Sequence, residues 1–250
     1  MADTSNLTGK RVLVTGGTGG VGRAVASRFV AHGARILITD REAATLEQAA
    51  DALREAAPGS VVAWAAADLS GATGADALFA EVDEILGGLD ILVACAGVGA
   101  GPLMEVSDGE WRYVIESNLM SYVACTQRAV ERMRNSASRD GIVILVGSIS
   151  VHIKAVGESV YNAAKGGVAS FAETLRKELM PEGIRVTLIE PGAIGTAMQP
   201  CSPEERAREI AEHKMLPPGE VADAILFAAT RGPGVDVVTL RIEPLVQKIY

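Results

Sequence analysis

The fold of this chain is decided near its N-terminus by the stretch Arg11-Val12-Leu13-Val14-Thr15-Gly16-Gly17-Thr18-Gly19-Gly20-Val21-Gly22. An aliphatic and β-branched run, 11–15, leads into a glycine-rich turn, and apolar residues at helical spacing follow it directly. Glycines permit a tight turn and let backbone N–H groups approach a pyrophosphate, while the helix N-terminus adds the positive end of its dipole. The pattern predicts that phosphate is bound by Gly16, Thr18, Gly20, Val21 and Gly22. A plain strand-to-helix turn is the alternative.

The alternation of strand and helix continues along the chain. Further strands are predicted at 35–39, 61–66, 90–94, 141–147, 184–189 and 235–242, and further helices at 43–56, 74–86, 108–134, 158–180, 204–214 and 220–229. Seven strands that alternate with helices predict the α/β class, with a doubly wound parallel sheet, helices on both faces and a single domain over 1–250. Residues 194–218 carry several prolines around a short charged helix, which suits a substrate lid.

The composition bounds the compartment and the partners. The chain has 250 residues, 48% of them hydrophobic, and a formal net charge of -8, which argues against nucleic acid and against an anionic membrane surface. Cys95, Cys125 and Cys201 form neither a CxxC pair nor a disulfide ladder, so we expect a reducing compartment and no metal site. Because the polar stretch 1–10 has no apolar leader and no run approaches the roughly 18 apolar residues of a membrane span, we expect a cytoplasmic protein.

The second strand ends at Asp40, 18 residues beyond Gly22 (40 − 22 = 18), close to the separation expected for an acidic residue that binds an adenosine ribose. A carboxylate accepts hydrogen bonds from the ribose hydroxyls and repels a 2′-phosphate, so NAD is favoured over NADP. Arg41 leaves NADP open, because a guanidinium can clamp such a phosphate. By residue type Asp40 also suits the N-cap of the helix 43–56, and both roles are compatible.

Two other strand ends carry residues suited to a ligand. Asp68-Leu69 follows the strand 61–66, and Cys95-Ala96-Gly97-Val98-Gly99 follows the strand 90–94. Small residues at the second position would let a flat ligand lie across the carboxyl edge of the sheet, where open α/β folds bind their ligands.

Tyr161 and Lys165 are four residues apart in the helix 158–180, so they share one helix face. A neighbouring ammonium favours the phenolate and lowers the pKa of the phenol, which prepares a tyrosine for general acid or base catalysis. The strand 141–147 ends at Ser148, thirteen residues before Tyr161 (161 − 148 = 13), and a loop of that length can fold Ser148 back toward the phenol. Ser150 competes with Ser148 by residue type.

Two more polar residues have alternative interpretations. Asn118 lies within the apolar part of the helix 108–134, where it is either a hydrogen-bonded core amide or a functional residue. His152 lies in the loop after Ser148. We interpret it as a pocket-lining or solvated residue rather than as an acid or base, since it is a single histidine with no evident partner, and the acid or base role is the alternative.

Taken together, these residues resemble the short-chain dehydrogenase/reductase family over about residues 7–242. Thr15-Gly16-x-x-x-Gly20-Val21-Gly22 looks like the family's cofactor turn, and the resemblance implies a Rossmann-like fold. Asn118, Ser148, Tyr161 and Lys165 look like its catalytic tetrad in order and spacing. The other cofactor contacts that the resemblance implies are Asp68 and Leu69 at the adenine, Ala96 and Gly97 along the cofactor, and Pro191, Gly192, Ile194 and Thr196 on the nicotinamide side.

The resemblance also implies a mechanism in which a hydride passes between a nicotinamide cofactor and a secondary alcohol or ketone. Tyr161 would exchange a proton with the substrate oxygen, and Ser148 would donate a hydrogen bond to that oxygen. Lys165 would hold the ribose hydroxyls and lower the pKa of Tyr161. Asn118 would bind a water that links Lys165 to solvent.

The chain departs from the family pattern in two places. The usual Asn-Asn-Ala-Gly reads Ala94-Cys95-Ala96-Gly97, so both amides that brace this strand end are lost. The C-terminal residues 240–247 are similar to a branch that includes 3-hydroxy acid and serine dehydrogenases, whose members tend to use NADP. Asp40 still favours NAD because charge repulsion acts locally, and an NADP-dependent ketone or 3-hydroxy acid reductase is the alternative.

The expected substrate is a small or medium, weakly polar alcohol or ketone, because the residues around the site are mostly apolar. A dinucleotide-binding regulator without turnover is the alternative from another class, and it would need the glycine turn but not the tetrad. The broad apolar surfaces of the helices 108–134 and 158–180, together with the resemblance, predict a homotetramer or homodimer. The residues expected in the substrate pocket are Val98, Ser148, His152, Ile153, Val156, Met198 and Met215.

Overall fold

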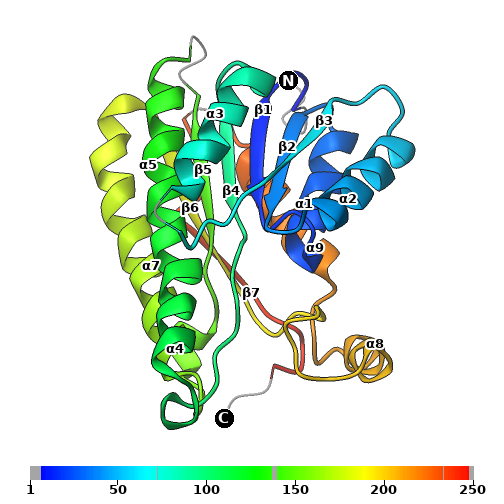
Figure 1. The fold of residues 1–250 in the computed structure, drawn as a ribbon, viewed down its shortest axis with the longest axis vertical. Coiled ribbons are helices and arrows are strands. Elements are labelled where there is room, and N and C mark those ends of the chain that lie inside the picture. Colours follow the sequence, from blue (N-terminus) through cyan, green and yellow to red (C-terminus); the bar gives the residue numbers. More distant parts are fainter. Residues whose placement is uncertain (1–6, 72, 137–139, 233, 248–250) are drawn as a thin grey trace.

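The computed structural model describes residues 7–71, 73–136, 140–232 and 234–247, so residues 1–6 of the polar N-terminal stretch lie outside the described residues. Within those ranges seven strands form one parallel sheet in the order β3-β2-β1-β4-β5-β6-β7 (Figure 1), which confirms the predicted α/β class and sheet. The strands are β1 Arg11–Thr15, β2 Arg35–Asp40, β3 Val62–Ala66, β4 Ile91–Ala94, β5 Ile142–Val146, β6 Arg185–Pro191 and β7 Thr239–Ile242.

Helices cover both faces of the sheet because its strands are apolar on both faces. Alternate residues of β1 enter different cores: Val12 and Val14 pack with α1, α2 and α9, whereas Leu13 packs with α3, α5 and α7. Figure 1 shows these two helical layers on either side of the strands. The six helices are α1 Gly20–Ala31, α2 Ala43–Ala56, α3 Gly74–Leu86, α5 Ser121–Arg134, α7 Ser159–Leu179 and α9 Pro218–Ala229.

The sheet changes its winding direction at β1. This strand pairs with β2 on one side and with β4 on the other, so the chain runs outward from β1 in both directions. Open α/β sheets bind ligands in the crevice at the carboxyl ends of the strands where the order reverses. Both Gly16, which follows β1, and Cys95, which follows β4, lie at that point.

The helix predicted at 108–134 is not one regular helix, and that expectation is wrong in detail. A π-helical turn, Glu116–Met120 (η2), separates α4, Asp108–Ile115, from α5. The side-chain amide of Asn118 donates to the carbonyl of Val114 over 2.9 Å, and this is the carbonyl that the residue's own N–H would take in a regular α-helix. The apolar spacing was correctly interpreted as helical, but it carries no signal for one extra residue in a turn.

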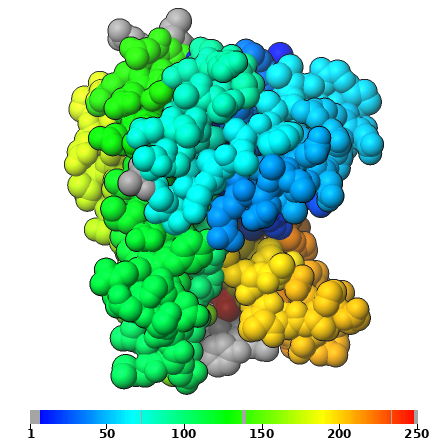
Figure 2. All heavy atoms as spheres, viewed as in Figure 1, coloured from blue at the N-terminus to red at the C-terminus, as the bar shows by residue number. Residues whose placement is uncertain are grey.

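The two ends of the segment predicted as a lid, 194–218, are joined to each other. Ile194 forms a parallel bridge with Leu216, and Leu216 N–H donates to the carbonyl of Ala193 over 2.7 Å. Between these ends, α8, Pro203–Ala211, has no buried residue. Figure 2 shows the molecular surface hollowed between this gold segment and the green segment that contains α4.

Three short elements complete the fold, and the sequence patterns did not predict them. They are α6, Ser150–Ile153, directly after Ser148, and the 3-10 turns η1, Leu103–Glu105, and η3, Met180–Glu182. No helix in the described part of the chain combines the length and the apolar character needed to cross a bilayer.

Candidate active site

The glycine turn after β1 is shaped so that side chains cannot occupy it. Gly16 has a φ of +69°, and a Cβ there would lie 2.9 Å from the backbone of Ala96. A Cβ on Gly22 would lie only 2.2 Å from the carbonyl oxygen of Gly16. No described side chain caps the N-terminus of α1. The turn therefore presents bare backbone at a helix N-terminus, which suits an anionic ligand.

Asp40, at the end of β2, faces this turn. One carboxylate oxygen accepts a hydrogen bond from the hydroxyl of Thr18, and the other accepts one from the backbone N–H of Arg41 over 2.9 Å. The guanidinium of Arg41 is exposed and lies 5.5 Å from the ring centre of Tyr113. Glu42, not Asp40, occupies the N-cap of α2, so the capping role considered for Asp40 is wrong.

The two strand ends that the sequence indicated lie on either side of this point. Asp68 accepts hydrogen bonds from the hydroxyl and the backbone N–H of Ser70, and these bonds lower the pKa of Asp68. Leu69 is half-buried against the core of the α3 layer. The backbone N–H of Ala96 donates to the hydroxyl of Thr15 over 3.2 Å, which ties the end of β4 to the end of β1.

The loop after β6 closes against the glycine turn. A Cβ on Gly20 would lie 2.6 Å from the methyl carbon of Thr196, so the turn and the loop are in contact. The carbonyl of Pro191 accepts a hydrogen bond from Ile149 N–H over 2.9 Å, which joins this loop to the segment that carries Ser148. Gly192 is buried and Ile194 is half-buried. The glycine turn and the loop that the resemblance assigned to the nicotinamide side are thus adjacent.

Ser148 and Tyr161 meet as the loop length predicted. Ser148 is buried two residues beyond β5, and its hydroxyl lies close enough to the phenol of Tyr161 to lower the pKa of that phenol. Ser150 does not replace Ser148, because its hydroxyl donates to Oγ of Ser148 over 2.9 Å. Ser150 therefore contacts Ser148, and of the two serines Ser148 is the one close to the phenol.

Burial raises the pKa of Tyr161, the hydrogen bond with Ser148 lowers it and the charge of Glu158 raises it again, with a net increase. The ammonium of Lys165 lies 5.9 Å from the ring centre of Tyr161. The expectation that Lys165, four residues from Tyr161, lowers the pKa of the phenol is therefore wrong for the protein without a bound cofactor. Their shared helix face is correct, but burial outweighs the charge at this distance.

Lys165 is buried on the inner face of α7, with 4% of its surface exposed. Its ammonium donates to the carbonyl of Val146 over 2.9 Å and to the hydroxyl of Tyr122 over 3.2 Å. Burial lowers the pKa of Lys165 to about 8, and Cys95 partly opposes this. A lysine with such a pKa changes its charge near neutral pH.

Asn118 lies at the same place, from the π-helical turn. Its amide nitrogen donates to the carbonyls of Val98, over 2.8 Å, and Val114, while its oxygen has no hydrogen-bond partner among the described residues although it is buried. A Cβ on Gly97 would lie 2.5 Å from this oxygen and 3.8 Å from the ammonium nitrogen of Lys165. A buried acceptor without a partner is unusual, and here it faces the cationic group.

His152 is paired rather than isolated. Its Nε2 lies 2.9 Å from a carboxylate oxygen of Glu190, the residue before Pro191, and the Glu190 side chain is only 6% exposed. The histidine side chain itself is 45% exposed. Glu190 was missed by sequence reasoning, and its one signal was an acidic residue directly after the apolar pair Leu188-Ile189.

The residues expected in the substrate pocket are only partly brought together. Met198 reaches the loop after β4, since its Cγ lies 3.9 Å from the Cβ position of Gly99. Val156, in contrast, is completely exposed, while Ile153 and Met215 are half-buried. Of the expected residues, Ser148 belongs to the cluster described above, and the carbonyl of Val98 accepts a hydrogen bond from Asn118.

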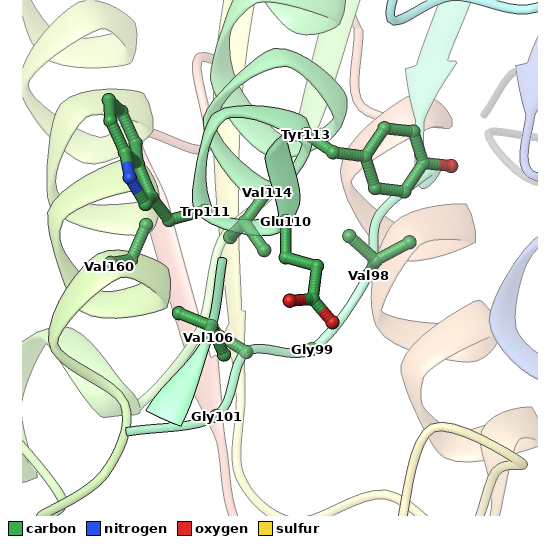
Figure 3. A pocket seen from close by; sticks show the side chains of 10 residues that line it. Val98, Gly99, Gly101, Val106, Glu110, Trp111, Tyr113, Val114 and Val160 are labelled. Carbon is green, nitrogen blue, oxygen red and sulfur yellow. The ribbon is translucent and has the colours of Figure 1, made fainter. Parts of the chain in front are cut away.

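A cavity of about 230 Å³ lies at the first turn of α4, between this helix, the loop after β4 and the start of α7. Figure 3 shows the carboxylate of Glu110 pointing into it, with Trp111 and Tyr113 directed to opposite sides. Val98 lines it, but Ser148, Tyr161 and Lys165 do not. The cavity is lined by Val98, Gly99, Ala100, Gly101, Val106, Glu110, Trp111, Tyr113, Val114 and Val160.

The arrangement fits a nicotinamide dinucleotide. The glycine turn offers backbone N–H groups without side chains, and the loop at Thr196 touches that turn. The far end of the crevice holds a buried ammonium, Lys165, and the unpartnered amide oxygen of Asn118. Anionic phosphates suit the first end and hydroxyl groups suit the second.

Comparisons with known proteins agree with this geometry. A family model described as short chain dehydrogenase matches residues 10–207. The 3-oxoacyl-(acyl-carrier-protein) reductase FabG of Vibrio cholerae is 30% identical over 230 residues, which cover 90% of this chain and 91% of that protein. Two solved structures are similar along their length. One is an actinorhodin polyketide ketoreductase variant with NADPH, with a TM-score of 0.84 and 28% sequence identity, and the match covers 98% of this chain and 99% of that one. The other is a metagenomic short-chain oxidoreductase in complex with NADP, with a TM-score of 0.81 and 26% sequence identity, and the match covers 95% of this chain and 98% of that one.

The family model covers most of the chain, and the seven-stranded sheet with its glycine turn is the fold of these structural relatives. The chain therefore belongs to the short chain dehydrogenase family of oxidoreductases.

Proposed function

We propose that this protein transfers a hydride between a nicotinamide cofactor, with NAD favoured, and a small or medium secondary alcohol or ketone. The observation that carries the proposal is the proximity of the buried Ser148 hydroxyl to the phenol of Tyr161, whose pKa it lowers, with the buried ammonium of Lys165 one helical turn further along α7. A hydroxyl, a phenol and a buried cation in this order match the needs of a proton exchange at a substrate oxygen.

Each residue has a defined task in this mechanism. Tyr161 takes the proton from the alcohol oxygen during oxidation and returns it to the ketone oxygen during reduction. Ser148 donates a hydrogen bond to the same oxygen and stabilises its developing negative charge. Lys165 binds the ribose hydroxyls, and Asn118 holds a water at its free amide oxygen that connects Lys165 to solvent. A bound nicotinamide supplies the hydride acceptor or donor, which is chemistry that no side chain provides.

Asp40 supports the preference for NAD. Its carboxylate lies at the end of β2 beside the glycine turn, where its charge opposes a 2′-phosphate. The exposed guanidinium of Arg41 supports NADP as the alternative, and the two structural relatives named above hold NADP or NADPH. We favour NAD because both oxygens of Asp40 are fixed by hydrogen bonds at this position, whereas Arg41 lies against Tyr113.

The proposed substrate is weakly polar. The segment 98–106 contains one charged residue, Glu105, and the nearby Met198 faces Gly99. Aliphatic and thioether groups accept apolar substituents of varied shape. Such a site favours a ketone or alcohol with small or medium alkyl or aryl substituents.

The deciding experiment is Tyr161→Phe, assayed with a panel of secondary alcohols and ketones and both cofactors by nicotinamide absorbance. Loss of the phenolic hydroxyl should lower kcat by at least about a thousandfold while the Kd for NADH stays within about twofold of wild type. Tyr113→Phe is the matched control, because its ring stacks against Arg41 away from Ser148. Full turnover in Tyr161→Phe would refute the assigned role.

The same panel separates the rival class. A dinucleotide-binding regulator would bind NADH with the wild-type protein but turn over none of the substrates under any condition. The proximity of Ser148 to Tyr161 argues against this class, because a regulator needs the glycine turn alone. Measurable turnover that disappears in Tyr161→Phe excludes it.

We further propose a homotetramer or homodimer assembled through α4, α5 and α7, which lie in one layer in Figure 1. Met120, in the π-helical turn, and Met180, directly after α7, expose 54% and 63% of their surface. Burying such side chains favours association. Solution scattering at micromolar concentration should give a mass of two or four chains, and a monomeric mass would exclude the assembly.

The cytoplasm is the proposed compartment. Cys95, Cys125 and Cys201 are free thiols, and burial raises the pKa of the first two to about 12, which makes them poorly reactive. Free thiols of this kind suit a reducing environment. Thiol titration of protein purified from the cytosol under denaturing, alkylating conditions should find all three reduced.

A further inference from the structure

The ionisable groups that surround the buried ammonium of Lys165 are neutral near pH 7. The ionisable groups close to its ammonium are Cys95 at the end of β4, Tyr122 on α5 and Tyr161 on α7, and among the described residues no carboxylate contributes to its pKa. Burial raises the pKa of Cys95 to about 12, so this thiol is neutral near pH 7. A buried ammonium without an anion needs dipoles and lone pairs to compensate for lost hydration.

Tyr122 provides part of that compensation. Its hydroxyl oxygen accepts a hydrogen bond from the ammonium of Lys165 over 3.2 Å, and its ring centre lies 4.7 Å from the same nitrogen. The tyrosine is 1% exposed, and burial raises its pKa well above the usual value, so the hydroxyl stays protonated. One side chain thus offers both a lone pair and an aromatic face to the cation.

The hydrogen bonds around Tyr122 also fix direction. The hydroxyl donates its hydrogen to the carbonyl of Val146 over 3.2 Å, and Lys165 donates to that same carbonyl over 2.9 Å. Lys165, Tyr122 and Val146 therefore form a closed triangle at the end of β5. An ammonium has three N–H groups, so two are fixed by this triangle and the third is left for a ligand.

The position of Tyr122 relates to the altered sequence after β4. Ala94 and Cys95 stand where the family pattern has two amides, and Cys95 is close enough to Tyr122 to affect its pKa. The hydroxyl of Tyr122 reaches from α5 to the carbonyl of Val146, the last residue of β5. Ala94 and Cys95 thus have small side chains, and the larger Tyr122 provides a hydrogen bond to β5 in the same region.

We propose that Tyr122 is a positioning residue for Lys165, which it holds against the end of β5 through its hydroxyl and its ring. The inference rests on the proposed role of Lys165 in binding the ribose. Tyr122→Phe isolates the hydroxyl, because the ring and its packing stay. Thr126→Val is the matched control: it deletes a buried hydroxyl one helical turn further along α5, and that hydroxyl has no partner among the described residues.

The direct readout is the titration of Lys165 in the cofactor-free protein, followed by NMR of lysine labelled at Cε and assigned with Lys165→Met. The wild-type midpoint should lie near 8. Tyr122→Phe should lower it by about one pH unit and raise the Kd for NADH about three- to tenfold, while Thr126→Val leaves both unchanged. If Tyr122→Phe melts earlier but keeps the wild-type midpoint and Kd, Tyr122 merely packs in the core and the proposal is wrong.

A second measurement does not depend on the titration. In the Lys165→Met background Tyr122 has no cation to hold, so adding Tyr122→Phe should shift the urea midpoint by less than half of its shift in the wild-type background. Equal shifts would show that the two residues are not coupled and would overturn the proposal. Neither readout requires turnover, so failure here is distinct from failure of the proposed function, which Tyr161→Phe tests.

Discussion

Ser150 donates its hydroxyl hydrogen to Oγ of Ser148 over 2.9 Å, and its backbone N–H points to the same oxygen over 3.1 Å. A hydroxyl oxygen has two lone pairs, so both acceptor positions of Ser148 are taken. The hydrogen of Ser148 is then left for another acceptor, and the phenol of Tyr161, whose pKa Ser148 lowers, lies close to it. Ser150 thereby sets Ser148 as a donor at the place where a substrate oxygen would meet the phenol.

Ser150→Ala should therefore lower kcat about tenfold with little change in the Kd for NADH, because one hydrogen bond that orients Ser148 is lost. Ser148→Ala should cost about a hundredfold or more, since it removes the donor itself. Ser60→Ala is the control, a serine near β3 whose buried hydroxyl has no partner among the described residues. A wild-type kcat in Ser150→Ala would mean that Ser148 is oriented without it.

Gly22→Ala should abolish tight cofactor binding. The added Cβ would lie 2.2 Å from the carbonyl oxygen of Gly16, and this contact forces the turn open at the proposed phosphate site. We expect the Kd for NADH, measured by fluorescence, to rise about a hundredfold, the size of effect that a displacement of about 1 Å produces in a binding geometry.

Gly109→Ala is the matched glycine substitution, since a Cβ there meets nothing within 4 Å on α4. It should leave the Kd unchanged and raise the free energy of unfolding by about 0.5–1 kcal/mol, because alanine has the better helix propensity. Equal Kd values for the two variants would show that the turn tolerates a side chain and does not cradle the phosphates.

The sequence patterns predicted those features that repeat locally. Apolar runs gave the strands and helical spacing gave the helices, because both depend on neighbours within a few residues. The glycine turn was identifiable for the same reason: Gly16 and Gly22 are close in the chain. The convergence of Ser148 with Tyr161 followed from the length of one connecting loop.

Other parts of the site depend on contacts between distant residues, which a pattern in one segment cannot show. Tyr122 had the spacing of a core residue on its helix, yet it meets Lys165, 43 positions away. Glu190 lies 38 positions from His152. The pKa of Tyr161 depends on how deeply the fold buries it, and the substrate pocket depends on loop conformations that left Val156 fully exposed.

The stability of the protein should fall in acid through Asp90, next to β4. Burial raises the pKa of Asp90, but hydrogen bonds from the side chain and the backbone N–H of Arg11, the charge of Arg11 and a hydrogen bond from Ser136 outweigh it and hold the pKa at about 2. An unfolded aspartate titrates near pH 3.9. The folded state therefore binds fewer protons, so this stabilisation is complete above about pH 4 and is lost between about pH 4 and 2.

Asp90→Asn should lower the free energy of unfolding by about 2 kcal/mol at pH 7 and flatten its decline between about pH 4 and 2, as measured by urea unfolding. Asp76→Asn is the control, because Asp76 pairs with Arg128 at the surface with 67% of its side chain exposed, and such pairs contribute under about 1 kcal/mol. An acid profile of Asp90→Asn that matches the wild type would place the acid sensitivity elsewhere.

Cofactor choice should change with Asp40→Ala. Removing this carboxylate removes the charge that opposes a 2′-phosphate beside the glycine turn, so the ratio of kcat/KM for NADP to that for NAD should rise at least about tenfold. Arg41→Ala serves as the opposite test. It should leave kcat/KM for NAD within about twofold of wild type, because the exposed guanidinium lies against Tyr113 rather than Asp40. It should lower kcat/KM for NADP, because a guanidinium that can bind the 2′-phosphate is lost. A wild-type protein that already prefers NADP, and loses that preference in Arg41→Ala, would show that the guanidinium, not the carboxylate, selects the cofactor.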